Sequence, residues 1–194
     1  HIEPFREDNF FALALNLKDT PSSPTLRQRL DMAARNPQWN DIILEESVKL
    51  IKNSSAPLTP IYLGTLEAQR QYLPLDIDVS PFDNSDSKKE GVSRTYKGFD
   101  GFAPIFAYLA REGYGINTEL RQGKDHSQNG TVEFLRKSIS HGKHLSSLPL
   151  LVRMDSGNDS AENISVCLDE ETKADFIIKR NIRKEKTETW LAIA

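Results

Sequence analysis

Two aspartates stand two positions apart in a hydrophobic stretch, LPLDIDVSPF, at residues 73–82. Asp76 and Asp78 alternate with apolar residues, and this alternation predicts a strand with one apolar and one acidic face. A second apolar stretch, LPLLVRMD, covers residues 148–155 and ends in Asp155. Carboxylates beside a core are costly unless they are paired, hydrogen-bonded or bound to a metal. Oxygen ligands of this kind suit Mg²⁺ or Mn²⁺, and two such ions can promote displacement at phosphorus.

Spacing alone leaves the choice of ligands open. Asp76 and Asp78 share one face of the predicted strand, so the alternation cannot decide which of them would bind a metal. An aspartate at the end of a strand more often caps a turn than binds a metal. We apply that interpretation to four other aspartates, which are Asp83, Asp86, Asp159 and Asp169. Asp159 also stands three positions before Glu162, a spacing typical of a helix capping box.

The elements that must position these residues change in character along the chain. Residues 1–70 carry helical patterns, and strands begin at about residue 73. Residues 94–123 predict two further strands, joined by a hairpin at Glu112 and Gly113, so that the first three strands form an antiparallel meander.

The second half of the strand region alternates with helices. GTVEFLRKSISHG at residues 130–142 has the apolar stripe of a helix, and it leads into the strand at 148–155. A second helix follows, and then a last strand, ADFIIKRN, at 174–181. The order is therefore β-β-β-α-β-α-β, an α/β fold with three antiparallel strands followed by parallel ones. In that order the first strand and the strand after the helix are central neighbours, so Asp78 and Asp155 should meet at one edge of the sheet.

Composition bounds the class of protein. The chain has 194 residues, of which 38% are hydrophobic and 27% are charged, with a formal net charge of −3. These values are typical of a globular protein. A single cysteine, Cys167, excludes a disulfide framework, and no apolar run is long enough to span a membrane. Because the sequence opens with HIEPF and has no start methionine, we expect it to be an internal part of a longer protein.

Two clusters of basic residues flank the predicted acidic edge and are candidates for contacts with DNA phosphates. The first follows the first acidic strand and comprises Lys88, Lys89, Arg94 and Lys97. The second follows the last strand and comprises Lys179, Arg180, Arg183 and Lys184. Tyr96 and Phe99 lie within the first cluster, where an aromatic ring could stack on a base, but we expect a core role for both.

Several motifs, in the same order, resemble the DDE transposases of bacterial insertion sequences. The group in question reads Asp-x-Asp-x-Ser/Thr in its first motif and Arg-x-Asp-Ser-Gly in its second, as do DIDVS at 76–80 and RMDSG at 153–157. The upstream SSPTLRQRLD at 22–31 and ELRQG at 119–123 add to the resemblance, which extends from about residue 8 to residue 182.

The resemblance implies a ribonuclease-H-like catalytic domain that cleaves and transfers the strands of transposon DNA. It implies that Asp78 and Asp155 are catalytic metal ligands, with Asp76 as a supporting neighbour, and that a two-metal site holds Mg²⁺ or Mn²⁺. The implied partners are transposon-end and target DNA, with a homo-oligomer in the intact protein, no membrane, and a bacterial cytoplasmic location. The DNA-binding candidates within the basic clusters are Lys88, Arg94, Lys97, Arg180, Arg183 and Lys184.

The sequence departs from the pattern at its end. The resemblance calls for a third carboxylate, a glutamate on a later helix, and we interpret Glu185 and Glu188 as solvated side chains in a charged stretch. We therefore expect a helical segment at 1–70, followed at 71–194 by a partial catalytic core that lacks the third carboxylate and is inactive alone. Two alternatives remain open: another metal-dependent nuclease on the same fold, and a non-catalytic, DNA-binding remnant of a transposase.

Overall fold

The structure is a computed structural model that describes residues 2–36, 38–65, 67–182 and 185–193. The chain divides into two compact units, His1–Glu46 and Ser47–Ala194. The first unit is helical, and it contains the 3-10 turn η1 (Glu3–Phe5), α1 (Asn9–Ala14), α2 (Ser23–Ala33) and the beginning of α3 (Gln38–Asn53). Asp8 and Ser22 accept backbone N–H groups at the starts of α1 and α2, as helix-capping residues do.

The second unit is built on a mixed sheet, and its strand order is the one that the sequence predicted. Its strands are β2 (Arg70–Val79), β6 (Ile105–Leu109), β7 (Tyr114–Glu119), β8 (Leu150–Met154) and β9 (Asp175–Ile178). They are arranged in the order β7-β6-β2-β8-β9, and the short strand β1 (Ile61–Leu63) pairs with the start of β2. The β2–β6 and β6–β7 pairs are antiparallel, whereas the β2–β8 and β8–β9 pairs are parallel. The predicted mixed sheet, with three antiparallel strands followed by parallel ones, is thus confirmed.

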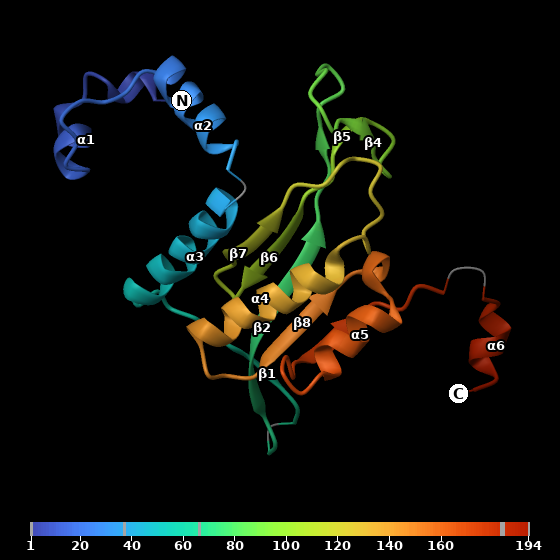
Figure 1. The fold of residues 1–194 in the computed structure, drawn as a ribbon. Helices are drawn as coiled ribbons and strands as arrows, with labels where there is room; N and C mark the ends of the chain where they lie inside the picture. Colours follow the sequence, from blue (N-terminus) through green and yellow to red (C-terminus); the bar gives the residue numbers. More distant parts are fainter. Residues whose placement is uncertain (1, 37, 66, 183–184, 194) are drawn as a thin grey trace. The chain divides into compact units, whose positions relative to one another are not determined.

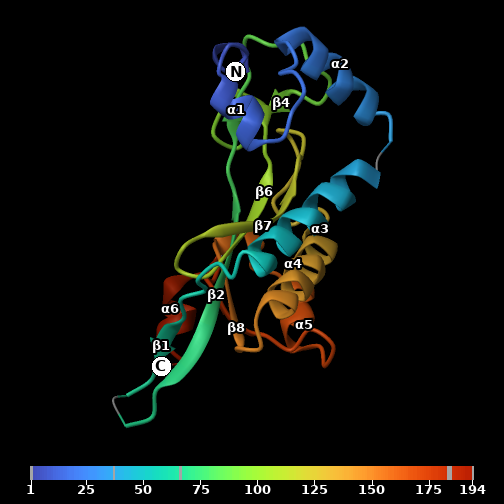
Figure 2. The same ribbon diagram turned by 90° about the vertical axis from the view of Figure 1, so that its left-hand side faces the viewer.

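Two helices cover one face of this sheet. Figures 1 and 2 show α4 (Thr131–Leu145) and α5 (Ala161–Leu168) side by side on the same side of the strands. Alternate residues of the central strands are buried beneath them, including Leu75, Ile77 and Val152, together with Leu135 and Ile139 from α4. Burial of this apolar face stabilises the sheet, and it leaves the acidic residues of β2 on the opposite face.

A smaller sheet follows the carboxyl end of β2. Its strands are β3 (Phe82–Asp83), β4 (Ser93–Arg94) and β5 (Asp100–Phe102), paired in the order β3-β5-β4. The polar residues between β3 and β4 are mostly exposed, as the composition of that segment predicted. In Figure 1 this small sheet lies beyond the carboxyl ends of the central strands.

The segment after β8 differs from the prediction in its helix cap. A 3-10 turn, η2 (Ser156–Asn158), comes directly after Asp155, and α5 begins at Ala161. The cap of α5 is Ser160, whose hydroxyl accepts the N–H of Asn163, so Asp159 does not form the predicted capping box. Asp159 is buried and binds other partners, which are described below.

The last described element is the short helix α6 (Thr187–Leu191). None of the helices in the described part of the chain combines the length and the apolar character that crossing a bilayer requires.

Candidate active site

The parallel register of β2 and β8 brings the predicted catalytic aspartates together. Asp76 lies opposite Arg153, and Ile77 lies opposite Met154, which is the last residue of β8. The next positions on the two strands are Asp78 and Asp155, and the backbone of Asp155 remains extended. Because side chains alternate between the faces of a sheet, both pairs belong to the face opposite α4 and α5.

The first pair, Asp76 and Arg153, is an ion pair and is called here the closed pair. Arg153 donates from Nε to Oδ1 of Asp76 at 2.5 Å and from Nη2 to Oδ2 at 2.6 Å. These hydrogen bonds to Asp76 raise the pKa of the Arg153 guanidinium above its ordinary value. The two-pronged contact neutralises Asp76 and fixes the direction of its carboxylate.

The second pair, Asp78 and Asp155, is called here the open pair, because neither carboxylate forms an ion pair with any described residue. Both side chains are exposed. The hydroxyl of Ser80 lies 3.4 Å from Oδ2 of Asp78. Oδ1 of Asp155 accepts the N–H of Gly157 at 3.1 Å and the side-chain N–H of Asn158 at 2.9 Å. The open pair thus concentrates negative charge that only neutral donors contact within the described part of the chain.

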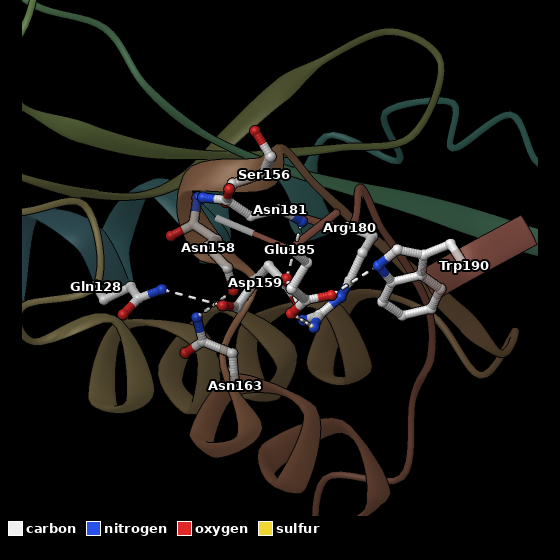
Figure 3. A network of polar contacts seen from close by, with 9 residues as sticks. All are labelled: Gln128, Ser156, Asn158, Asp159, Asn163, Arg180, Asn181, Glu185 and Trp190. Atoms are coloured by element: carbon white, nitrogen blue, oxygen red, sulfur yellow. Dashed lines mark hydrogen bonds and ion pairs between the residues drawn. The ribbon is translucent and has the colours of Figure 1, made fainter. Parts of the chain in front are cut away.

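A buried polar network holds the turn that follows Asp155 (Figure 3). Asn158 is fully buried, and its carbonyl accepts the side-chain N–H of Asn163 at 2.9 Å. The carbonyl of Asp159 accepts from Gln128 at 3.1 Å. Since these donors come from α5 and from the segment before α4, the turn is fixed from both sides, and with it the direction of Asp155.

The same network engages Arg180 and Glu185. Oδ2 of Asp159 accepts from Nη1 of Arg180 at 2.8 Å and from the backbone N–H of Asn181 at 2.9 Å. Arg180 also binds Oε1 of Glu185 at 2.8 Å, and its guanidinium lies 5.5 Å from the centre of the Trp190 ring. Glu185 accepts the indole N–H of Trp190 at 2.7 Å as well.

These contacts bear on the second basic cluster and on the charged stretch after it. The guanidinium of Arg180 serves the packing of the segment after β9, where it balances Asp159 and Glu185. Glu185 is exposed, and both of its carboxylate oxygens are engaged in this network. Arg183 and Lys184, the other candidates of this cluster, lie outside the described residues.

A cleft of about 520 Å³ is lined by Asp155 of the open pair and by Val79, the residue after Asp78. One wall comes from the end of β2 and the turn after β4, and the other comes from the segment 123–127 and the turn after β8. Its lining residues are Val79, Arg94, Thr95, Tyr96, Gly123, Lys124, Asp125, His126, Ser127, Asp155, Ser156, Gly157 and Asn181.

Gly123 explains how the two walls approach each other. A Cβ atom at this position would lie 2.1 Å from the carbonyl oxygen of Ser93 and 2.5 Å from that of Gly101. Only a residue without a side chain can therefore let the segment 123–127 cross β4 and β5 so closely. Ser127 ties the same segment to the turn after β8 by donating to the carbonyl of Gly157 at 2.7 Å.

Tyr96 lies at the tip of the β4–β5 hairpin and lines the cleft. Its side chain is 72% exposed, so the predicted core role is wrong for this residue, whereas Phe99 is half-buried. Burial of the phenol raises the pKa of Tyr96, and the negative charges of Asp78 and of Asp155 raise it further. The Tyr96 hydroxyl is therefore within electrostatic reach of both members of the open pair.

Three residues of the first basic cluster surround this hairpin. Arg94 lines the cleft and forms an exposed ion pair with Asp100 at 3.6 Å. Lys97 is exposed in the hairpin turn, and Lys88 is exposed in the loop between β3 and β4. Sequence reasoning missed Lys124 and His126, which line the opposite wall. The signal that could have found them is the polar segment GKDHS, which directly follows ELRQ at the end of β7.

The donor atoms at the open pair fit a divalent cation. Both side chains offer carboxylate oxygens, which Mg²⁺ and Mn²⁺ prefer, and no described basic side chain competes for them by an ion pair. Within the described residues, no group of three or more His, Cys, Asp or Glu side chains could hold a metal ion. The pair by itself therefore leaves most coordination positions to water or to an anionic substrate.

Comparison with known proteins places the chain among transposase domains. The family model described as transposase DDE domain group 1 matches residues 1–188. No curated protein matches the chain. A solved structure, the cryo-EM structure of a piggyBac transposase synaptic complex with hairpin DNA, is similar over 92% of this chain at 15% sequence identity, with a TM-score of 0.48. The chain spans about a third of the length of that transposase, of which 34% is covered.

Proposed function

Because the chain belongs to the transposase DDE domain family, group 1, we propose that it takes part in metal-dependent cleavage and transfer of DNA strands at transposon ends. The observation that carries the proposal is the open pair. Asp78 and Asp155 are 77 positions apart in sequence (155 − 78), yet each comes directly after the paired residues Ile77 and Met154 at the carboxyl edge of two parallel strands. Like charges at one edge of a sheet repel each other, and a bound cation would relieve that repulsion.

Members of this family generally use divalent metal ions. We propose that Asp78 and Asp155 hold Mg²⁺ or Mn²⁺, as a two-metal site in the intact enzyme. When bound, such ions supply activation of an attacking oxygen and charge stabilisation at the phosphate. Asn158 and Gly157 donate to one oxygen of Asp155, which leaves its other oxygen for the cation. Asp76 supports the site indirectly, since its ion pair keeps Arg153 away from Asp78.

The walls of the cleft would bind the backbone of the DNA. Arg94 and Lys124 stand on opposite walls, and both are exposed, so a phosphate could contact either without desolvating a buried ion pair. Lys88 and Lys97 extend the basic surface along the small sheet. Arg183 and Lys184 remain candidates from the sequence. We propose that the substrates are transposon-end DNA and target DNA, and that residues 71–194 form part of the catalytic core. The preceding residues 1–70 contain helices up to Asn53 and then the short strand β1.

Two other functions remain in view. Another metal-dependent nuclease would use the open pair in the same way on a different DNA. A non-catalytic, DNA-binding relative of a transposase is favoured by one observation: the described residues contain no third acidic, histidine or cysteine side chain that completes a metal-binding group. For the same reason we expect this chain alone to leave supercoiled plasmid DNA uncut in the presence of Mn²⁺.

Binding of duplex DNA with and without Mn²⁺ tests the proposal. Fluorescence anisotropy of a labelled duplex should show tighter binding when Mn²⁺ is added, because phosphate oxygens complete the coordination that the open pair begins. Asp78→Asn and Asp155→Asn should remove this increase and leave metal-free binding nearly unchanged. Equal affinity of the wild-type chain with and without Mn²⁺ would favour the non-catalytic DNA-binding alternative.

A further inference from the structure

The β4–β5 hairpin holds Tyr96 in a defined place beside the open pair. The buried Thr95 donates from both its backbone N–H and its hydroxyl to the carbonyl of Phe99, each at 2.8 Å. Gly98 closes the turn by donating to the carbonyl of Thr95 at 3.0 Å, with the positive φ of 89° that favours glycine. A tip fixed by these bonds positions its exposed side chain at little entropic cost.

Tyr96 is one of several exposed aromatic residues, and it differs from Tyr62 in lining the cleft. The ring is largely exposed, and it lines the cleft together with Asp155, Arg94 and Lys124. The hydroxyl, at the far end of the ring, lies in the field of both Asp78 and Asp155. A largely exposed side chain that lines the same cleft as Asp155 is placed to contact a ligand of that pair.

The chemistry of a phenol suits this location. A lysine or arginine at the same place would form an ion pair with Asp78 or Asp155 and compete with a metal cation. A tyrosine hydroxyl is neutral, so it leaves the charge of the carboxylates for the cation and can still donate to an anion. Hydrogen bonds from neutral donors to charged oxygens are stronger than those between two neutral groups.

We propose that the Tyr96 hydroxyl donates a hydrogen bond to a non-bridging oxygen of the DNA phosphate that sits at the open pair. Tyr96 is then a substrate-binding residue on the wall opposite Lys124. This inference rests on the proposed function, because it takes a phosphate held with the metal at Asp78 and Asp155 as the ligand. It assigns the hydroxyl, and not the face of the ring, as the group that contacts DNA.

The test measures the increase in affinity that Mn²⁺ gives to a short duplex DNA, for the wild-type chain, Tyr96→Phe and Tyr96→Ala. Tyr96→Phe keeps the ring and removes only the donor. We expect it to reduce the Mn²⁺-dependent increase about tenfold, the size of one hydrogen bond to a charged group. Tyr96→Ala should lose no more than Tyr96→Phe. The control is Tyr62→Phe, which alters an exposed tyrosine on β1 whose hydroxyl accepts from Gln71; it should behave as the wild type does.

Calorimetric titration of Mn²⁺ without DNA separates the failures. If both Tyr96→Phe and the wild type bind Mn²⁺ and show the same Mn²⁺-dependent increase in DNA affinity, the inference about Tyr96 is overturned and the proposed function stands. If Tyr96→Phe resembles the wild type and Tyr96→Ala is weak, the ring stacks on a base and the hydroxyl assignment is wrong. If the wild type binds no Mn²⁺, the proposed function fails, and the inference fails with it.

Discussion

The closed pair and the open pair lie on the same face of the same two strands, two residues apart, and yet they differ in charge balance. Asp76 meets Arg153 in a two-pronged ion pair, whereas Asp78 meets Asp155 and only neutral donors. Asp76 and Asp78 have the same residue type and lie on the same face of the same strand, so neither property explains the difference. What distinguishes them is the residue on the neighbouring strand: Asp76 pairs with the cation Arg153, whereas Asp78 follows the last register pair, Ile77 with Met154, as does the carboxylate Asp155.

The difference shows how the fold can make one aspartate a structural residue and leave another available to bind a metal ion. An aspartate that has its own guanidinium is satisfied within the protein and gains little from a metal. Two facing carboxylates without a cation repel each other, and an external divalent ion removes that repulsion. The closed pair also engages Arg153, and this keeps the guanidinium from neutralising Asp78.

The largest expected effect comes from removing a charge of the open pair. Asp78→Asn and Asp155→Asn should each abolish detectable Mn²⁺ binding in calorimetric titration, because a single carboxylate with water holds the ion too weakly. Asp83→Asn is the matched control: that carboxylate accepts from the hydroxyl and the N–H of Ser85, and its loss should leave Mn²⁺ binding intact. The metal role is refuted if Asp78→Asn binds Mn²⁺ as the wild type does.

A second variant removes the ion pair between Asp76 and Arg153. Arg153→Gln removes the cation and leaves a shorter, neutral polar side chain, so Asp76 becomes a third unneutralised carboxylate on this face. We expect the affinity for Mn²⁺ to rise about threefold to tenfold, as the loss of a nearby positive charge favours a cation. The same titration measures it. An unchanged or lower affinity would mean that charge balance does not distinguish the two pairs.

A smaller effect concerns the basic wall of the cleft. The logarithm of the DNA association constant should fall with the logarithm of salt concentration, with a slope near −0.9 per neutralised phosphate. Replacing Arg94 and Lys97 together by alanine should flatten this slope by about 1 to 2. Arg70 and Lys173 lie near the amino ends of β2 and β9, away from the carboxyl edge that carries the open pair. Their double alanine variant is the matched control. If both double variants keep the wild-type slope, Arg94 and Lys97 belong to a solvated surface.

The smallest effect concerns carboxylates away from both pairs. Backbone and side-chain donors lower the pKa of Asp83 and of Asp169 from an ordinary value of 3.8, and that of Glu112 from 4.5. A lowered pKa in the folded state stabilises the fold above the unfolded-state pKa, and this contribution is lost as the pH falls through the folded-state value. The free energy of unfolding, from urea titrations, should therefore decline as the pH drops below these values. A free energy that rises in this range would contradict the donors assigned here.

Much of the sheet could be predicted because its signals are local. The alternation in LPLDIDVSPF, the apolar stripe of α4 and the hairpin at Glu112 and Gly113 each specify an element within a few residues. Chain order and the handedness of crossovers then place β2 beside β8. The meeting of Asp78 and Asp155 follows from these rules, whereas the choice of Asp78 over Asp76 required the motif resemblance.

The unpredicted features depend on contacts between distant segments. The closed pair depends on the strand register that places Asp76 opposite Arg153. The sequence around either residue does not predict which residue will be its partner. Asp159 matches a capping box in sequence, but Arg180 and Asn181 draw its carboxylate into the network after β9. The sequence predicts a core position for Tyr96, but the hairpin leaves its side chain exposed in the lining of the cleft. In each case packing across the fold outweighs local preference.

The most direct test of the central claim is an anomalous difference map from crystals of the wild-type chain soaked in Mn²⁺. If the open pair is a metal site, the map should contain a peak between the carboxylates of Asp78 and Asp155, bonded to an oxygen of each, while Asp76 stays bound to Arg153. No peak at that edge in crystals that bind Mn²⁺ elsewhere, or a peak coordinated by Asp76 in place of Asp78, would contradict the assignment.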